Sequence, residues 1–303
     1  MQNVQMYKQL LTILFISLSL QMAAQSFGTQ WIGATTSTDD NQLWFRRAYV
    51  LPTSIHRAHL EITTTGRVAV YVNQYNVSRD VLMPYREKHE THCPACLSFD
   101  VTPYIQADTN TIAVWYAPQE SHEKEGEPQI AVWFYGTDTQ GKAFAFASDK
   151  SWTWSIANAN SVCIDATDWR PDWNSATPDI MPWVGATSAQ SPQQPLAKNH
   201  HLAQRITKEM QPSWTHVTPD SIEAGFPAPL HGWIRVTLRG AHSGERITIN
   251  KLHYICNGNM DEQACRRFTE EDTDHVIIKG DSRFNATQVQ NIEGLQISTV
   301  RDE

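Results

Sequence analysis

The chain has 303 residues, a formal net charge of −8 and eleven tryptophans, and only 18% of its residues are charged. The acidic balance excludes the basic surface that nucleic-acid binding needs. The length allows two ordinary domains or one large all-β domain.

Residues 1–26 have the pattern of a secretory signal peptide. Lys8 supplies a positive charge, residues 10–20 (LLTILFISLSL) are apolar but too short to span a membrane, and cleavage is expected after Ala24 or Ser26. The alternative is an uncleaved N-terminal anchor. We therefore expect a secreted protein, or a bacterial periplasmic one, with no transmembrane segment after cleavage.

Short aromatic and β-branched segments follow, with turn signals between them. The segments are 44–51, 59–64, 68–72, 97–101, 110–117, 129–136, 142–147 and 151–157. In GRVAVYVNQYNV (66–77) both faces of the segment are apolar, which predicts a strand buried on both sides and followed by a turn at Asn73. Residues 135–141 predict a hairpin loop. The spacing favours a β-sandwich or barrel.

A change of composition divides the chain. Residues 174–200 are rich in Pro, Ser, Gln and Ala without a hydrophobic period, and strands resume at 233–240, 246–255 and 274–280. We predict two β-sandwich domains, at 27–173 and 214–303, joined by a linker or strap at 174–213. No internal repeat of fixed period is present.

The order of local motifs resembles the N-terminal, non-catalytic part of bacterial α-L-rhamnosidases of glycoside hydrolase family 78. The motifs are LWFRRAYVLP (43–52), RAHLEITTTGRVAVYVNQYNV (57–77), LSFDVTPYI (97–105), NTIAVWYA (110–117), HGWIRVTLRGAHSGERITINKLHYICNGNM (231–260) and DTDHVIIKG (272–280). The resemblance implies an all-β fold of two jelly-roll β-sandwiches, one galactose-binding-like and one concanavalin-like. Asn73-Gln74 stands where the family has an Asn-Gly turn.

The resemblance also bears on catalysis. In that family a helical barrel follows these modules and carries the catalytic carboxyl groups, so we expect no enzymatic activity from these modules alone. The leading hypothesis is a secreted accessory carbohydrate-binding protein that recognises rhamnose-containing glycans. Two alternatives stay open. One is the front piece of a split or truncated rhamnosidase that needs a separate catalytic subunit, and the other is a structural docking module.

Residues 163–173 (CIDATDWRPDW) hold the candidate site. They resemble a Gly-Glu-x-x-Asp-Ala-Arg element in a module that binds rhamnose with calcium in some members of the family. By that resemblance Asp165, Asp168 and Asp172 are candidate calcium ligands, since carboxylate oxygens suit this ion. The candidate sugar contacts are Arg170, through paired hydrogen bonds, and Trp169 and Trp173, through their flat rings. The alternative is a salt-bridged turn with core tryptophans.

Two other groups of residues carry weaker hypotheses. HETHCPAC (89–96) contains His89, His92, Cys93 and Cys96, for which a local disulfide, free thiols, a zinc site and a redox pair all stay open. Two acidic clusters are expected to be solvated loops; their members are Glu123, Glu125 and Glu127, and Glu270, Glu271 and Asp272. The five cysteines, which also include Cys163, Cys256 and Cys265, are an odd number and leave at least one thiol unpaired in any framework of disulfides within the chain.

Overall fold

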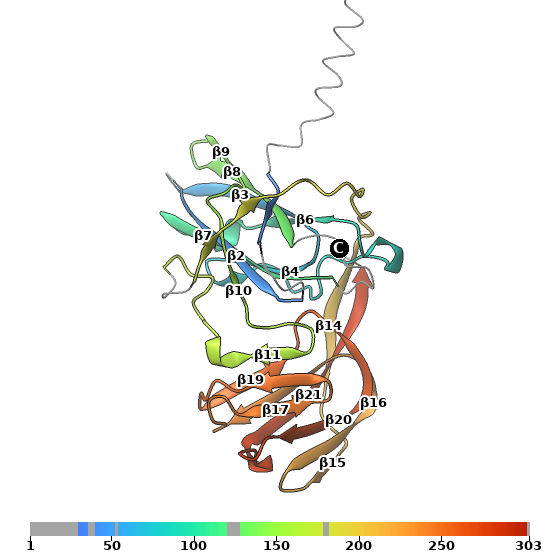
Figure 1. Ribbon diagram of the computed structural model, residues 1–303. Helices are drawn as coiled ribbons and strands as arrows, with labels where there is room; N and C mark the ends of the chain where they lie inside the picture. The colour runs from blue at the N-terminus through green and yellow to red at the C-terminus, as the bar shows by residue number, and fades with distance from the viewer. Residues whose placement is uncertain (1–29, 36–39, 52–53, 120–127, 178–181, 302–303) are drawn as a thin grey trace, which may run out of the picture.

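The computed structural model describes residues 30–35, 40–51, 54–119, 128–177 and 182–301. Figure 1 shows two β-units, one above the other, with the later strands forming the lower one. The signal peptide expected at residues 1–26 lies outside the described residues. Within the described ranges the regular elements are strands and four short 3-10 turns, which confirms the all-β prediction. No helix in this part of the chain is long and apolar enough to cross a membrane.

The upper unit is built from two six-stranded sheets. The first has the order β13 (Thr187–Ser188), β1 (Ile32–Gly33), β8 (Gln129–Asp138), β3 (Ile55–Thr64) and β6 (Ala95–Asp100), with β9 (Ala143–Ala147) also paired to β8. The second has the order β12 (Val184–Gly185), β10 (Thr153–Ile156), β2 (Leu43–Val50), β7 (Thr109–Ala117), β4 (Arg67–Val72) and β5 (Tyr75–Asn76).

The two sheets enclose one apolar core. Phe45 and Ile112 from the second sheet meet Leu60 and Phe134 from the first, and each of these side chains is fully buried. Burial of side chains of this size stabilises a fold by about 1.5–3 kcal/mol each. Such a double layer is the sandwich that the alternating segments predict.

Strand β4 is apolar on both faces, as its sequence predicts. Its three valines, at 68, 70 and 72, point into the sandwich core, whereas Ala69 and Tyr71 pack on the outer side of the second sheet. The strand ends in a two-residue turn in which Asn73 and Gln74 both have positive φ, at 49° and 73°. Positive φ at both positions is the hairpin geometry in which glycine usually takes the second place.

The lower unit is one nine-stranded sheet that wraps around its own core. Its main path is β11 (Cys163–Asp165), β18 (Leu252–Ile255), β17 (Arg246–Ile249), β20 (Glu271–Gly280), β16 (Ser221–Arg239), β21 (Val289–Arg301) and β14 (Leu202–Met210); β15 (Trp214–Val217) and β19 (Asp261–Cys265) also pair with β16. The register of β16 against β20 shifts between Gly225 and Leu230. Pro227 and Pro229 lie inside this shift, and proline cannot donate a ladder hydrogen bond, so the strand bends there.

The sheet pairing differs from the predicted boundaries in three ways. β11 was expected in the first domain, yet it pairs in parallel with β18 of the nine-stranded sheet. The predicted linker at 174–213 contains β12 and β13, which extend the upper sheets, and β14, which pairs with β21. The single strand expected at 246–255 is a hairpin of β17 and β18, because Asn250 turns the chain with a φ of 50°.

Candidate functional site

The predicted site at 163–173 is a turn between the two units, held by side-chain hydrogen bonds and ring packing. β11 leads into the 3-10 turn η3 (Ala166–Asp168), and the Asp165 carboxylate accepts hydrogen bonds from the Thr167 backbone N–H at 3.0 Å and from the Thr167 hydroxyl at 2.5 Å. A short acidic side chain at this position satisfies the free amide groups at the start of the turn. Asp165 is therefore occupied in holding the backbone of the turn.

The tryptophans of the turn pack inward. Trp173 is 2% exposed and stacks on Trp44 of β2, with 5.1 Å between ring centroids and 11° between planes. Trp169 is half-buried and lies with its ring centroid 5.6 Å from that of Trp44 and 5.4 Å from that of Trp115. Trp173 therefore has no open face for a sugar ring, because the second sheet covers it, and the alternative of core tryptophans describes it better.

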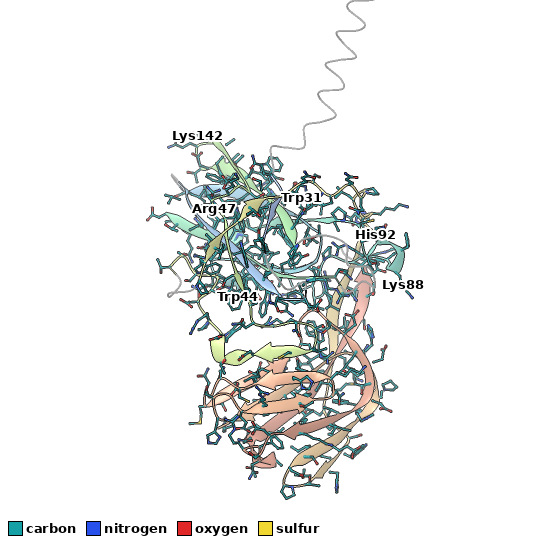
Figure 2. All side chains as sticks on the ribbon, in the orientation of Figure 1. Trp31, Trp44, Arg47, Lys88, His92 and Lys142 are labelled. Carbon is teal, nitrogen blue, oxygen red and sulfur yellow. The ribbon has the colours of Figure 1, made fainter. Side chains whose placement is uncertain are left out.

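We call this aromatic group the junction cluster. Its members are Trp44, Trp115, Trp169, Trp173 and, from the lower unit, Phe268. Figure 2 shows Trp44 at the edge of the upper unit that faces β11. The cluster packs the turn against the second sheet. The backbone from which the polar side chains of the turn extend is therefore held in place.

The polar groups of the turn lie nearer to solvent. Asp168 and Arg170 are exposed, and the Asn158 side-chain amide donates to the Asp168 carboxylate at 3.2 Å. Burial lowers the pKa of Arg46, and the nearby negative charge of Asp172 opposes that shift. The described part of the chain has no group of three His, Cys, Asp or Glu side chains placed to hold a metal ion. Calcium therefore stays a prediction for measurement in solution.

The junction is also held by charge. Arg67 of β4 forms an ion pair of 2.8 Å with Glu270, and its side chain also donates to the Phe268 carbonyl oxygen. The Arg267 guanidinium lies over the Trp115 ring at 4.7 Å from the centroid. Glu270 was expected in a solvated loop, and this is wrong because its carboxylate is three-quarters buried against Arg67. The other acidic cluster, Glu123 to Glu127, lies outside the described residues.

The HETHCPAC segment forms a loop that holds the linker. Glu90 accepts a hydrogen bond from the Lys198 backbone N–H at 3.3 Å, and its carboxylate lies 2.7 Å from the His200 ring. Cys93 is buried and Cys96 is exposed on β6, and all five cysteines are unpaired thiols. His92, labelled in Figure 2 beside Lys88, joins no three-residue metal group within the described residues.

A second group of rings lies on the outer face of the first sheet. Trp133 and Tyr135 stack with 4.0 Å between centroids, and His59 stacks on Tyr135 at 5.6 Å. The Tyr135 hydroxyl donates to the Glu61 carboxylate, and burial with this hydrogen bond raises the pKa of Tyr135. These half-buried rings pack on one another. The packing stabilises the surface of the sheet and covers much of each ring.

Comparison with known families shows to which protein family the chain belongs. The family model described as Alpha-L-rhamnosidase N-terminal domain matches residues 53–208, which is just over half of the chain. The chain belongs to this family. An α-L-rhamnosidase of Formosa agariphila is 28% identical over 147 residues, which are 41% of this chain and 15% of that protein.

Solved rhamnosidases share the fold of both units. The enzyme of Dictyoglumus thermophilum matches 91% of this chain and 36% of its own, with a TM-score of 0.79 and 21% identity. That of Aspergillus terreus matches 90% and 36%, with a TM-score of 0.77 and 16% identity. That of Streptomyces avermitilis, complexed with L-rhamnose, matches 86% and 29%, with a TM-score of 0.74 and 18% identity. This rhamnosidase-type chain thus spans 15% of its curated relative and about a third of the solved ones.

Proposed function

We propose that the chain is an exported, non-catalytic accessory protein that binds rhamnose-containing glycans. Membership of the rhamnosidase N-terminal family supports a link with glycans, and one solved relative of the same fold was complexed with L-rhamnose. Export rests on the signal-peptide pattern of residues 1–26. The rigid turn at 163–173 is the observation that carries the proposal.

The exposed pair on that turn has the chemistry to hold a sugar. The Asp168 carboxylate accepts hydrogen bonds, the Arg170 guanidinium donates them, and neighbouring hydroxyls of a pyranose offer both partners. The junction cluster holds the turn before any ligand arrives, so little ordering free energy is lost on binding. Trp169 adds its half-buried edge, and Trp173 acts only by supporting the turn.

Calorimetric titration with L-rhamnose tests this function. The protein is titrated in calcium and in a chelator, together with the double variant Asp168→Asn, Arg170→Gln. We expect saturable heat from the unmodified protein and at least a tenfold weaker affinity from the double variant. The double variant Asp261→Asn, Arg239→Gln is a matched control, because it removes an equally charged, exposed pair elsewhere. Unchanged affinity in the turn variant would contradict this site, and dependence on calcium would support the metal prediction.

A second candidate is a subunit of a larger rhamnosidase assembly. The chain matches 36% of the first solved relative. This proposal assigns the hydrolytic groups to a catalytic subunit that works together with this chain. Incubation of the protein alone with an aryl α-L-rhamnoside is then expected to release no aglycone. Release by the purified chain would contradict both this candidate and the accessory role.

A further inference from the structure

Trp214 differs from every other tryptophan of the chain. All eleven lie in described ranges, and ten are buried or half-buried, whereas Trp214 is 49% exposed. Trp214 begins β15, the edge strand of the lower unit, and in Figure 1 β15 lies at the end of that unit remote from β11. The exposure of such a large apolar ring to water needs a physical explanation.

A glycine lets this ring lie close to the sheet backbone. Trp214 lies opposite Gly225 of β16, and a Cβ added to Gly225 would come 2.1 Å from the indole nitrogen and 2.3 Å from the adjacent ring carbon. Gly225 has no positive φ, so its backbone does not require glycine. Glycine within a strand often marks a close approach of another group. Here that group is the indole, which lies close to the Gly225 backbone while the side chain stays half exposed.

Polar side chains lie near the ring on the same face of the sheet, together with Ile277, which lies opposite Glu223 and is 36% exposed. Antiparallel partners share a face, so the register places His275 of β20 across Gly225 from Trp214, and His216 opposite Glu223 in the neighbouring row. All three of these neighbours are exposed. The His275 ring is held by Asp274 at 2.7 Å. We call Trp214, Gly225, His216, Glu223 and His275 the Trp214 platform.

The size and charge of this surface favour a small neutral ligand. A stable protein partner needs about 800 Å² on each side with few charges at its centre, whereas an aromatic side chain offers at most about 150–250 Å². Around this ring the exposed face carries Glu223 and Lys279. The net charge of −8 disfavours polyanions such as nucleic acids or phosphorylated lipids. A pyranose fits, because its C–H face is apolar and its edge carries hydroxyls.

We propose that the Trp214 platform is a saccharide-binding site, in which one neutral pyranose stacks on the open indole face while His275, His216 and Glu223 hydrogen-bond its hydroxyls. The site goes beyond the proposed function, because it lies on a different sheet face from the turn at 163–173. It gives the chain two separate contacts for one branched or extended glycan, and linked contacts raise the overall affinity.

Four variants test the site by calorimetry with L-rhamnose, in the native background and in the Asp168→Asn, Arg170→Gln background. Trp214→Ala is expected to weaken binding at the platform at least tenfold. Trp214→Phe keeps a smaller ring and is expected to lose less. Gly225→Ala pushes the indole off the sheet and is expected to resemble Trp214→Ala. Val217→Ala on the same strand, where Val217 is 58% exposed, is the matched control and is expected to bind normally.

The outcomes separate the two sites. Heat that Trp214→Ala and Gly225→Ala leave unchanged contradicts the platform and leaves the turn in place. Heat that Trp214→Ala abolishes and the turn variant leaves unchanged contradicts the turn alone. No heat from the unmodified protein contradicts both. Thermal unfolding of each variant is measured alongside, and a Trp214→Ala protein that loses stability but keeps its affinity assigns the ring a purely structural role. If Trp214→Ala does not fold, the affinity of Trp214→Phe is measured in its place.

Discussion

The junction cluster and the Trp214 platform use the same side chain for opposite purposes. At the junction, Trp44 is 1% exposed, with the Trp173 ring of the turn stacked on it and the Trp115 ring of the neighbouring strand packed edge to face. On the platform, Trp214 rests on a bare backbone and is 49% exposed. Burial of an aromatic ring stabilises the fold, whereas an exposed ring contributes little stability and is available for a ligand.

The comparison explains why the tryptophans predicted for sugar binding are the less suitable ones. Trp169 and Trp173 stand beside acidic residues in the sequence, which makes them resemble a sugar site. In the fold they instead fasten the turn to the second sheet. The tryptophan with an open side stands in the stretch expected to be the boundary between linker and second domain.

The largest expected loss of stability comes from removing a ring of the junction cluster. Trp44→Ala removes a fully buried ring and is expected to lower the free energy of unfolding by about 3–5 kcal/mol. Trp214→Ala makes the same chemical change on the open face and is expected to cost about 1 kcal/mol or less. Urea unfolding of both variants measures the difference. Equal losses would break the comparison, because Trp214 would then be a structural residue like Trp44.

The ion pair at the junction is expected to contribute more to stability than an exposed ion pair elsewhere in the lower unit. Glu270→Gln weakens the largely buried pair with Arg67 and is expected to cost about 1–3 kcal/mol, because the guanidinium keeps its burial without its counter-charge. Asp261→Asn weakens the exposed pair with Arg239 and is expected to cost much less, because water screens the two charges. A double-mutant cycle for each pair measures the coupling. A larger coupling for the exposed pair would contradict the view that the junction holds the two units together.

The smallest expected effect is a pH dependence at the platform. The hydrogen bond from His275 lowers the pKa of Asp274 in the folded protein. Because the folded pKa lies below the unfolded value of about 3.9, this contribution is present above pH 3.9 and is lost as the pH falls through the folded pKa. The melting temperature of the unmodified protein is therefore expected to be slightly higher than that of Asp274→Asn at pH 5.5, and equal to it at pH 2.5. A difference that grows on acidification would show that the sign is wrong.

Much of the fold follows from sequence alone, since alternating segments such as Val68–Val70–Val72 mark strands directly. The missed strands have physical reasons. β16 contains Pro227 and Pro229, which signal a loop unless a bulge is known to hold them. β14 lies in the polar linker and forms only because β21 pairs with it, eighty residues or more further along the chain.

The platform could not be predicted because it depends on register. Trp214 and Gly225 are eleven residues apart, and only the register of the hairpin between them brings them opposite each other. One signal was available, namely the pattern of a tryptophan, a turn at Pro219-Asp220 and a strand glycine at matching distances from the turn. At the turn of residues 163–173, the sequence singled out Asp168 and Arg170 as candidate site residues but could not decide between a sugar contact and a core position for Trp173, which packing on the second sheet determines.

Fluorine NMR of protein labelled with 5-fluorotryptophan tests the central claim most directly. The Trp214 signal is identified by its absence from Trp214→Phe, and L-rhamnose is then added. We predict that the Trp214 signal shifts and saturates, while the signals of Trp44, Trp115 and Trp173 stay in place. A Trp214 signal that does not move at saturating sugar, or signals of Trp44, Trp115 or Trp173 that move in its stead, would contradict the division of the tryptophans into structural and ligand-binding residues.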